Sequence, residues 1–423
     1  MINKTLNNIF KGDKVIWMVF FFLCVVSIVE VFSASSGLTY KGGNYLSPML
    51  KHIGIFMMGI VGMVITLNIP CRYFKLLTPF LLFLSFVTLI AVYFMGDATN
   101  DSARWLNFLG LKFQPSEIAK GTMVLATAQI LSAMQTEKGA DPNAFNYILG
   151  VCVFIIPLIM VENLSTAVLL CAVIFMMMIL GRVPLRQLGR LLGVVALLIV
   201  FVLAMVMLLG KDDVRPANAK HLTEQIAKPK KETGTVGKVF HRFDTWKSRV
   251  NKFINSHEVS PKEVDLDKDA QVAHANIAIA TSNVVGKGPG NSVERDFLSQ
   301  AFSDFIYAII IEEMGFVGAF FVAILYIILL FRTGRIANRC LNNFPAFLAM
   351  GFALLLVTQA LFNMCVAVGL APVTGQPLPL VSKGGTSTII NCIYVGAILS
   401  ISRSAKTKDG SKEHLQATTA MAS

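Results

Sequence analysis

The chain has 423 residues, enough for two or three soluble domains, but its composition excludes that arrangement. Hydrophobic residues make up 55% of the chain and charged residues only 15%, against about 25% charged residues in typical soluble domains. Too few polar side chains are present to cover a water-facing surface. The net charge of +12 leaves nucleic acid, anionic lipid and membrane orientation as explanations, and the positions of the charges must decide between them.

The apolar residues are grouped in runs that are long enough to cross a membrane. A run of about 17–25 apolar residues crosses the hydrocarbon core of a bilayer as a helix, and ten such runs follow one another. They lie near residues 15–35, 50–70, 76–96, 114–134, 146–162, 165–181, 187–209, 304–331, 346–368 and 386–402. The sequence therefore predicts an all-α polytopic membrane protein with ten transmembrane helices, forming a single integral membrane domain over residues 1–423.

Lys and Arg are distributed unevenly between the two sides that these spans define. Apart from the long connection 210–303, 16 of them fall on the side of the N-terminus, and the short loops on the other side hold only Lys41, Lys51, Arg104, Lys112 and Lys383. Because positive residues favour the cytoplasm, both termini, including the tail 403–423, are predicted to be cytoplasmic. The positive charge is then mainly an orientation signal in the cytoplasmic (inner) membrane, and no nucleic-acid partner is expected.

One connection is much longer than the others. Residues 210–303, between the seventh and eighth spans, form a large polar extracytoplasmic loop, and loops held by a rigid frame often carry function. Between positions 239 and 254 apolar residues fall at helical spacing, with Lys and Arg interleaved. This pattern is typical of a helix that lies in the lipid interface, and equally of an amphipathic helix packed on the bundle.

Charged side chains inside spans are costly to bury and are therefore functional candidates. Glu117 and Lys120 are three residues apart in the fourth span and are expected to pair, either within a site or only to fix helix packing. Asp304 begins the eighth span at its outer boundary. It is a candidate general base, and the alternative is that Ser303 or Asp304 caps the helix. The remaining charged residues in spans are Glu30, Glu312 and Glu313.

Two outer loops are rich in glycine or proline. Residues 286–292 (Gly-Lys-Gly-Pro-Gly-Asn-Ser) form a turn without the Gly-Lys-Ser/Thr ending of a P-loop. Residues 377–387 join the last two spans. The basic residues of the outer side would suit phosphate groups, or merely lipid headgroups; they are Arg104, Lys112, Lys287 and Lys383. The six His and seven Cys show no ligand spacing, so no dedicated metal site is predicted.

Four segments, taken in order, resemble the signature of a known family. They are Asn100–Leu106 with Phe113–Lys120, Gly286–Ser292, Ser303–Ala308 with Glu312–Gly315, and Pro379–Ser387. With ten spans and the long loop in the corresponding place, the chain resembles the shape, elongation, division and sporulation (SEDS) family of cell-wall glycosyltransferases, the FtsW/RodA group, over nearly its whole length.

The resemblance implies a peptidoglycan glycosyltransferase. Such an enzyme polymerises lipid II into β-1,4 glycan strands at the outer face, with inversion and release of undecaprenyl pyrophosphate. The family's proposed catalytic carboxylate falls on Asp304, and its lysine on Lys120. Cations for the pyrophosphate are expected at Arg104, Lys120 and Lys383. The other substrate-binding candidates are Glu117, Lys287 and Ser382. The resemblance points to no particular cofactor, and a divalent cation, Mg²⁺ or Mn²⁺, would suit the pyrophosphate.

Finer features of the resemblance bear on the role in the cell. Residues 286–292 are closer to the division branch, FtsW, than to the elongation branch, RodA, which implies a class B penicillin-binding transpeptidase and other divisome proteins as partners. Residues 161–166 lack the proline and aspartate of many members, and Lys383 replaces the usual aromatic residue. Two rival hypotheses stay open: a transporter that flips lipid II, and a non-catalytic scaffold for the transpeptidase.

Overall fold

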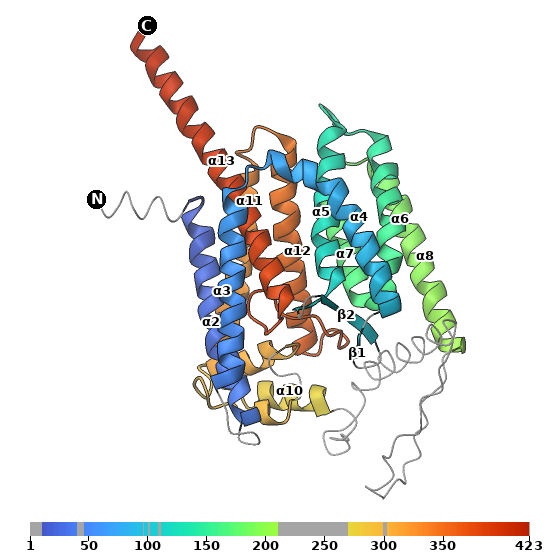
Figure 1. Ribbon diagram of the computed structural model, residues 1–423, viewed down its shortest axis with the longest axis vertical. Coiled ribbons are helices and arrows are strands. Elements are labelled where there is room, and N and C mark those ends of the chain that lie inside the picture. Colours follow the sequence, from blue (N-terminus) through green and yellow to red (C-terminus); the bar gives the residue numbers. More distant parts are fainter. Residues whose placement is uncertain are drawn as a thin grey trace, which may run out of the picture.

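The computed structural model describes residues 11–39, 46–95, 97–99, 102–108, 111–209, 270–298 and 303–422. Its long helices stand side by side as a bundle (Figure 1). In chain order they are α2 (Lys14–Thr39), α3 (Leu46–Asn68), α4 (Arg72–Met95), α5 (Pro115–Ala133), α6 (Pro142–Glu162), α7 (Leu164–Leu180), α8 (Leu185–Leu209), α11 (Ile306–Ala337), α12 (Asn343–Ala367) and α13 (Thr386–Ala422).

The two ends of the bundle differ. α2 begins and α13 ends at one of them, and the other carries the short elements β1 (Asp97–Thr99), β2 (Ser102–Phe108) and α10 (Ala270–Ala280) (Figure 1). We call the latter the α10 end. This arrangement agrees with the prediction that the first span begins, and the last span ends, on the same side of the membrane.

The helices are those of a multi-span membrane protein, as predicted. Seven of them, α2, α3, α4, α6, α11, α12 and α13, are long and apolar enough to cross a bilayer. The other three predicted spans are also helical, although α7 has only 17 residues and α5 includes Glu117 and Lys120. The eighth predicted span differs at its start: α11 begins at Ile306, so Asp304 precedes the helix.

The fifth and sixth predicted spans are joined by a single residue. α6 ends at Glu162 and α7 begins at Leu164, and Asn163 is at once the last cap of α6 and the first cap of α7. Its side-chain oxygen accepts hydrogen bonds from the backbone N–H groups of Ser165 at 3.1 Å and Thr166 at 3.4 Å. An Asx cap of this kind satisfies donors that begin a helix, which allows the tight hairpin.

Short strands are the part of the secondary structure that the all-α prediction omits. β1, β2 and β3 (Leu111–Phe113) form a three-stranded antiparallel sheet between α4 and α5. At the other end of α5, β4 (Gln135–Thr136) pairs with β5 (Gly139–Ala140). Backbone N–H and C=O groups close to a membrane need hydrogen-bond partners. In these short connections the strands provide them by pairing with one another.

The centre of the bundle is formed by α5, α12 and α13. Within their apolar windows 61% of α12 and 72% of α13 are buried, against 22% of α4. Gly351 allows α12 to approach its neighbours, since a Cβ there would lie 2.6 Å from Val124 of α5 and 2.8 Å from Met177 of α7. Small residues at such contacts are typical of membrane helices. Large apolar side chains on the outer helices, such as Phe80, Phe83 and Phe154, are exposed.

The long predicted loop 210–303 is described only in part. Residues 270–298 and 303 are described; they include α10, which packs against α11, and the 3-10 turn Glu294–Asp296. The amphipathic segment 239–254 lies outside the described residues, and both hypotheses for it stay as predictions.

Candidate functional site

Asp304 lies in a turn directly before α11, at the α10 end. The residue is half-buried, and the Ser303 hydroxyl donates a 2.9 Å hydrogen bond to its Oδ1. The N-cap position of α11 is Phe305, and no side chain caps the helix. The alternative that Ser303 or Asp304 serves as a helix cap is therefore wrong, because the Asp304 carboxylate stands outside the helix.

The backbone of this turn is held by side chains from two other elements. Asn363 of α12 donates from its amide nitrogen to the carbonyl of Asp304 at 2.9 Å, and to that of Gln376 at 2.7 Å. The Ser382 hydroxyl donates to the carbonyl of Ser303 at 2.6 Å. Both carbonyls of the turn are thus bonded, which fixes the direction in which the carboxylate leaves the backbone.

Ser382 was predicted to bind substrate, but its hydroxyl forms hydrogen bonds to two backbone groups. Besides donating to Ser303, its oxygen accepts a 2.8 Å bond from the N–H of Leu378. The structure therefore gives Ser382 a positioning role: it ties the connection between α12 and α13 to the turn that carries Asp304.

That connection is itself held from several helices. Gln359 donates to the carbonyl of Pro377 at 3.1 Å, Tyr326 of α11 donates to that of Pro379, and Ser27 of α2 donates to that of Val381 at 2.6 Å. Leu380 adopts φ 64°, a left-handed conformation that costs energy for a residue with a Cβ. Such strain persists only where the surroundings impose it, and it is concentrated at functional loops.

Glu117 and Lys120 form the predicted pair in the interior of the bundle. Lys120 Nζ lies 2.8 Å from Glu117 Oε1 and donates a 2.9 Å hydrogen bond to Gln359 Oε1. Lys120 is 0% exposed and Glu117 2%. The pair is therefore not at an open surface, and it connects α5 with α12.

One face of α12 links this pair to Asp304. Gln359 and Asn363 are four residues apart, so they lie on the same side of the helix. Gln359 receives Lys120 and holds Pro377, and Asn363 holds Asp304. The structure thus brings Lys120, Ser382 and Asp304 into one hydrogen-bonded unit through side chains that the sequence reasoning did not single out.

Lys287 lies in the glycine-rich turn and is paired with an acid of α11. Its ammonium lies 2.6 Å from Glu312 Oε1 and 3.1 Å from the Thr281 hydroxyl. Its backbone N–H donates to the carbonyl of Glu312 at 2.9 Å. The ammonium of Lys287, which the sequence suggested for a phosphate group, thus holds residues 286–292 on α11.

The second acid, Glu313, holds the same turn. It accepts hydrogen bonds from the backbone N–H of Gly290 at 2.9 Å and of Ser292 at 3.3 Å, and from the Ser33 hydroxyl. Arg295 lies 3.9 Å from its carboxylate. Glu312 and Glu313 are both 0% exposed, and their main role in the structure is to anchor the turn.

Close backbone approach explains the glycines at this contact. Gly315 has φ 67° and ψ −171° and kinks α11, and a Cβ on it would lie 2.3 Å from the carbonyl oxygen of Val284. Gly286, with φ 79°, would place a Cβ 2.3 Å from the carbonyl oxygen of Glu313. Only glycine fits either position.

The remaining candidates are Lys383 and Arg104. Lys383 is half-buried between α12 and α13, and its pKa is lowered from 10.5 first by burial and then by Lys51 of α3. Arg104 falls on β2, but its side chain lies outside the part that the structure describes. Within the described residues no group of three or more His, Cys, Asp or Glu side chains would hold a metal ion, and the divalent cation stays a prediction.

Three neutral amides are the site residues that the sequence reasoning missed. Gln359, Asn363 and Gln376 are 1%, 1% and 4% exposed, and the Gln376 amide also donates to the Thr166 hydroxyl at 2.7 Å. The sequence does contain a sign of two of them: Gln359 and Asn363 are polar, lie four residues apart and interrupt the apolar run 346–368. Neutral amides carry no charge to bury, so the cost that marks charged residues in spans does not mark them.

Comparison with known proteins extends over nearly the whole chain. The family model for FtsW, RodA and SpoVE, described as cell cycle protein, matches residues 13–407. A probable peptidoglycan glycosyltransferase FtsW from Hahella chejuensis is 30% identical over 388 residues, covering 90% of this chain and 87% of its own. The peptidoglycan glycosyltransferase MrdB of Escherichia coli K12 is 27% identical over 394 residues, covering 92% and 93%.

Solved structures show the same fold. A chain of a peptidoglycan synthase complex that coordinates polymerization and crosslinking has a TM-score of 0.68 at 21% identity, covering 93% of this chain and 98% of its own. The rod shape determining protein RodA of Thermus thermophilus has a TM-score of 0.60 at 19% identity, covering 93% and 97%. The chain is thus a multi-pass membrane protein, and the match to residues 13–407 shows that it belongs to the FtsW/RodA/SpoVE (SEDS) family.

Proposed function

We propose that this protein is a peptidoglycan glycosyltransferase that polymerises lipid II, with Asp304 as its general base. The observation that carries the proposal is the Asp304 turn: a half-buried carboxylate that does not cap α11, on a backbone held by Asn363 and Ser382. The relatives named as peptidoglycan glycosyltransferases support it.

The reaction is a displacement at the anomeric carbon of the lipid-linked donor. The hydroxyl of the acceptor sugar attacks that carbon, the bond from carbon to the pyrophosphate oxygen breaks, and the hydroxyl proton passes to the Asp304 carboxylate. The configuration inverts, giving a β-1,4 bond, and undecaprenyl pyrophosphate leaves. A carboxylate with a fixed direction suits this step, because a general base must lie within hydrogen-bond reach of the proton.

Negative charge that develops on the leaving pyrophosphate needs nearby cations. We assign this role to Arg104 and Lys383, from β2 and from the connection between α12 and α13. Lys120 acts differently in this proposal. Since its ammonium is buried against Glu117 and Gln359, it positions the connection through Gln359 and Pro377. Lys287 and Glu117 likewise support the site and do not touch the substrate in this arrangement.

The orientation follows from the charges of the loops. We place the α10 end outside the cytoplasm and both termini inside, with ten spans that include α5, α7 and α8. The lipid tails of donor and product then stay in the bilayer while the sugars react at the outer face. A class B penicillin-binding transpeptidase is the proposed partner, supported by the fold shared with a chain of a peptidoglycan synthase complex.

The division role is a finer proposal. It rests on residues 286–292, whose sequence is closer to the division branch. Relatives named FtsW and MrdB match this chain to nearly the same extent, so depletion of the protein in cells is the direct test: filaments with unfinished septa support division, and round cells support elongation.

The catalytic proposal is tested with the full-length protein purified together with its transpeptidase partner. Labelled lipid II is supplied, and glycan polymer is measured for the wild type and for Asp304→Asn, which keeps the shape and loses the base. We expect a loss of about 10²–10⁴-fold in rate. The control is Glu137→Gln, an exposed acid near the opposite end of α5, which should leave the rate unchanged.

The result separates the rival hypotheses. Polymer from Asp304→Asn at the wild-type rate would remove Asp304 as the base. No polymer from the folded wild-type complex would favour the scaffold, or the transporter if the same preparation moves labelled lipid II across vesicles. The transporter hypothesis relied on buried acids, of which Glu312 and Glu313 are engaged by residues 286–292.

A further inference from the structure

Two buried side chains, one from α2 and one from α3, meet the connection between α12 and α13. The Ser27 hydroxyl of α2 donates a 2.6 Å hydrogen bond to the carbonyl of Val381, and the same oxygen lies 3.0 Å from Nε2 of His52 in α3. Both side chains are buried. Buried polar groups are normally hydrogen-bonded within the protein, so these three groups depend on one another.

The direction of these bonds assigns a proton of the His52 ring. A hydroxyl has one hydrogen to donate, and that of Ser27 goes to the carbonyl of Val381, which can only accept. The hydrogen between Ser27 and His52 must therefore come from Nε2 of the ring. The other ring nitrogen, Nδ1, is buried and has no hydrogen-bond partner among the described residues. His52 thus acts as a donor through Nε2 alone.

Ser27 bonds a neighbouring segment and not its own helix. A serine or threonine hydroxyl in a helix readily donates to the carbonyl four residues earlier, as Thr66 and Thr78 do. For Ser27 that acceptor would be the carbonyl of Leu23. Reaching it requires a rotation that moves the oxygen away from the ring of His52. The Nε2–H group therefore holds the hydroxyl in the position that reaches the connection.

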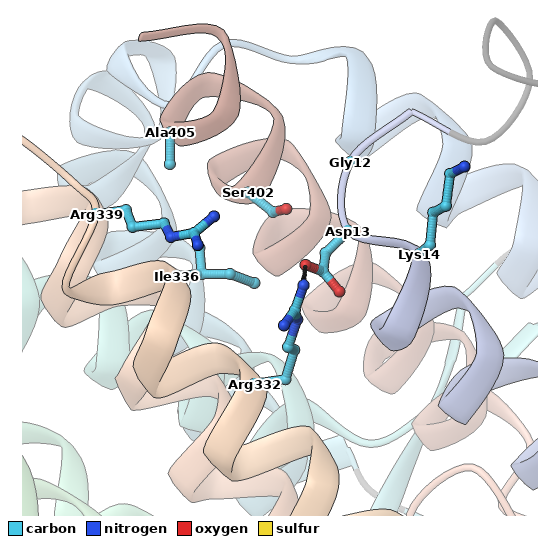
Figure 2. A pocket seen from close by; sticks show the side chains of 8 residues that line it. All are labelled: Gly12, Asp13, Lys14, Arg332, Ile336, Arg339, Ser402 and Ala405. Atoms are coloured by element: carbon cyan, nitrogen blue, oxygen red, sulfur yellow. Dashed lines mark hydrogen bonds and ion pairs between the residues drawn. The ribbon is translucent and has the colours of Figure 1, made fainter. Parts of the chain in front are cut away.

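α2 is itself held on α11 before and after Ser27. Just before the helix begins, Asp13 Oδ2 lies 2.8 Å from Nη2 of Arg332, as Figure 2 shows. Further along α2, the Ser33 hydroxyl donates to the carboxylate of Glu313. Because both contacts join α2 to the same helix, they fix the height of Ser27 in the bundle.

The segment that Ser27 holds leads directly to the Asp304 turn. Val381 follows Leu380, whose φ of 64° is a strained conformation that persists only where the surroundings impose it. Val381 precedes Ser382, which donates to the carbonyl of Ser303 at 2.6 Å. Without the bond to Val381 the strained residue can relax, and Ser382 then shifts relative to the turn.

We propose that His52 is a positioning residue for the proposed glycosyl transfer. Its Nε2–H group keeps the Ser27 hydroxyl on Val381, and this bond keeps Ser382 and the Asp304 turn in place. The imidazole does not touch the substrate. The catalytic consequence rests on the proposed function, whereas the proton on Nε2 and the hold on the connection are properties of the folded protein itself.

The first test is spectroscopic and needs no substrate. Full-length protein with ¹⁵N-labelled histidine is reconstituted in lipid and studied by solid-state NMR, and the signals of His52 are identified by their loss in His52→Gln. We expect a ring that carries a proton on Nε2. A ring protonated only on Nδ1 would overturn the proposal, because it has no hydrogen to give to Ser27.

The second test compares two amides at position 52. The amide nitrogen of glutamine reaches about as far as Nε2 of histidine, and that of asparagine only as far as Nδ1, so His52→Gln keeps the donor and His52→Asn loses it. Polymerisation of labelled lipid II by the complex with the transpeptidase, amide exchange of residues 377–387 and thermal unfolding are measured. We expect His52→Asn to exchange faster and to lose about tenfold in kcat, as the loss of one hydrogen bond implies, with KM little changed. His52→Gln should stay close to the wild type.

A double variant tests whether His52 acts through Ser27. In a Ser27→Ala background, His52→Asn should cost no further kcat. A further tenfold loss there, or equal behaviour of His52→Gln and His52→Asn in kcat and exchange, would overturn the proposal. Absence of polymer from the wild-type complex would instead remove the proposed function and the catalytic part of this proposal, while the ring proton and the amide exchange still decide whether His52 holds the connection.

Discussion

The side-chain amide of Asn363 donates a 2.9 Å hydrogen bond to the backbone carbonyl of Asp304, a residue 59 positions earlier in the chain. The same amide bonds the carbonyl of Gln376 at 2.7 Å. One neutral side chain from the most central part of the bundle thus fixes both the turn with the proposed base and the connection between α12 and α13. The site is organised from α12, which contributes no charged residue to it.

The first prediction concerns this amide. Asn363→Ala leaves the carbonyls of half-buried Asp304 and of buried Gln376 without their side-chain donor, and a buried carbonyl without a partner costs about 1–3 kcal/mol. We expect a loss of polymerisation rate of about tenfold or more, because the Asp304 carboxylate loses its fixed direction. Rate and thermal unfolding are measured on the same preparation with labelled lipid II.

A matched control separates position from stability. Asn342 precedes α12, is exposed and makes no side-chain cap, so Asn342→Ala should change neither quantity. If Asn363→Ala lowered the unfolding temperature and yet polymerised lipid II at the wild-type rate, Asn363 would be a packing residue and not a positioning residue.

The second prediction concerns the buried pair of α5. Lys120→Met leaves the Glu117 carboxylate, 2% exposed, without its cation, and breaking a buried pair costs about 3–5 kcal/mol. Adding Glu117→Gln removes the uncompensated charge, so the double variant should recover a large part of the stability. Unfolding of the four proteins as a double-mutant cycle measures the coupling.

Activity gives the second readout of that cycle. Because Lys120 also bonds Gln359, the double variant should regain stability without regaining full polymerisation. Full recovery of both would show that Lys120 serves packing alone. No recovery of stability would show that the charge left on Glu117 is not the cause of the destabilisation.

The sequence predicted the spans well because membrane helices are encoded locally, by runs of apolar residues. It also predicted the Glu117–Lys120 pair, which depends only on helical spacing. It did not predict that Lys287 would pair with Glu312, or that Ser382 would bond Ser303, since these contacts join residues 25 and 79 positions apart. Loop residues that carry charge look alike in sequence whether they face substrate or dock the loop.

The third prediction compares two glycines of the turn 286–292. Both Gly286 and Gly290 have positive φ, at 79° and 87°, so alanine at either costs about 1–2 kcal/mol of backbone strain. At Gly286 the Cβ would also collide with backbone atoms of α11, whereas nothing lies within 4 Å at Gly290. Gly286→Ala should therefore release the turn from Glu312 and Glu313, and Gly290→Ala should not.

Limited proteolysis and amide exchange of residues 281–298 measure that release. Faster exchange in Gly286→Ala, with Gly290→Ala close to the wild type, is expected. Equal behaviour of the two variants would mean that backbone strain, and not the close approach to α11, decides how firmly the turn is held.

The last prediction concerns pH and Lys383. Burial, and then the charge of Lys51, lower the pKa of Lys383 from 10.5. Below the lowered pKa the side chain is charged in both the folded and the unfolded protein, so folding bears the cost of burying the charge. As pH rises through the lowered pKa towards 10.5, the unfolded chain keeps more protons and this cost is relieved. Stability relative to Lys383→Gln should therefore increase with pH in that window.

Polymerisation should change in the opposite direction. If the Lys383 ammonium stabilises the leaving pyrophosphate, its loss in the same window lowers the rate while the protein becomes more stable. Lys383→Arg keeps its charge throughout, so it should retain activity at alkaline pH where the wild type declines. Rate and unfolding are measured for the wild type, Lys383→Gln and Lys383→Arg from pH 7 to about 10.5. Equal alkaline declines in the wild type and in Lys383→Arg would assign the decline to another group, and Lys383 would then be a tolerated replacement without a part in the reaction.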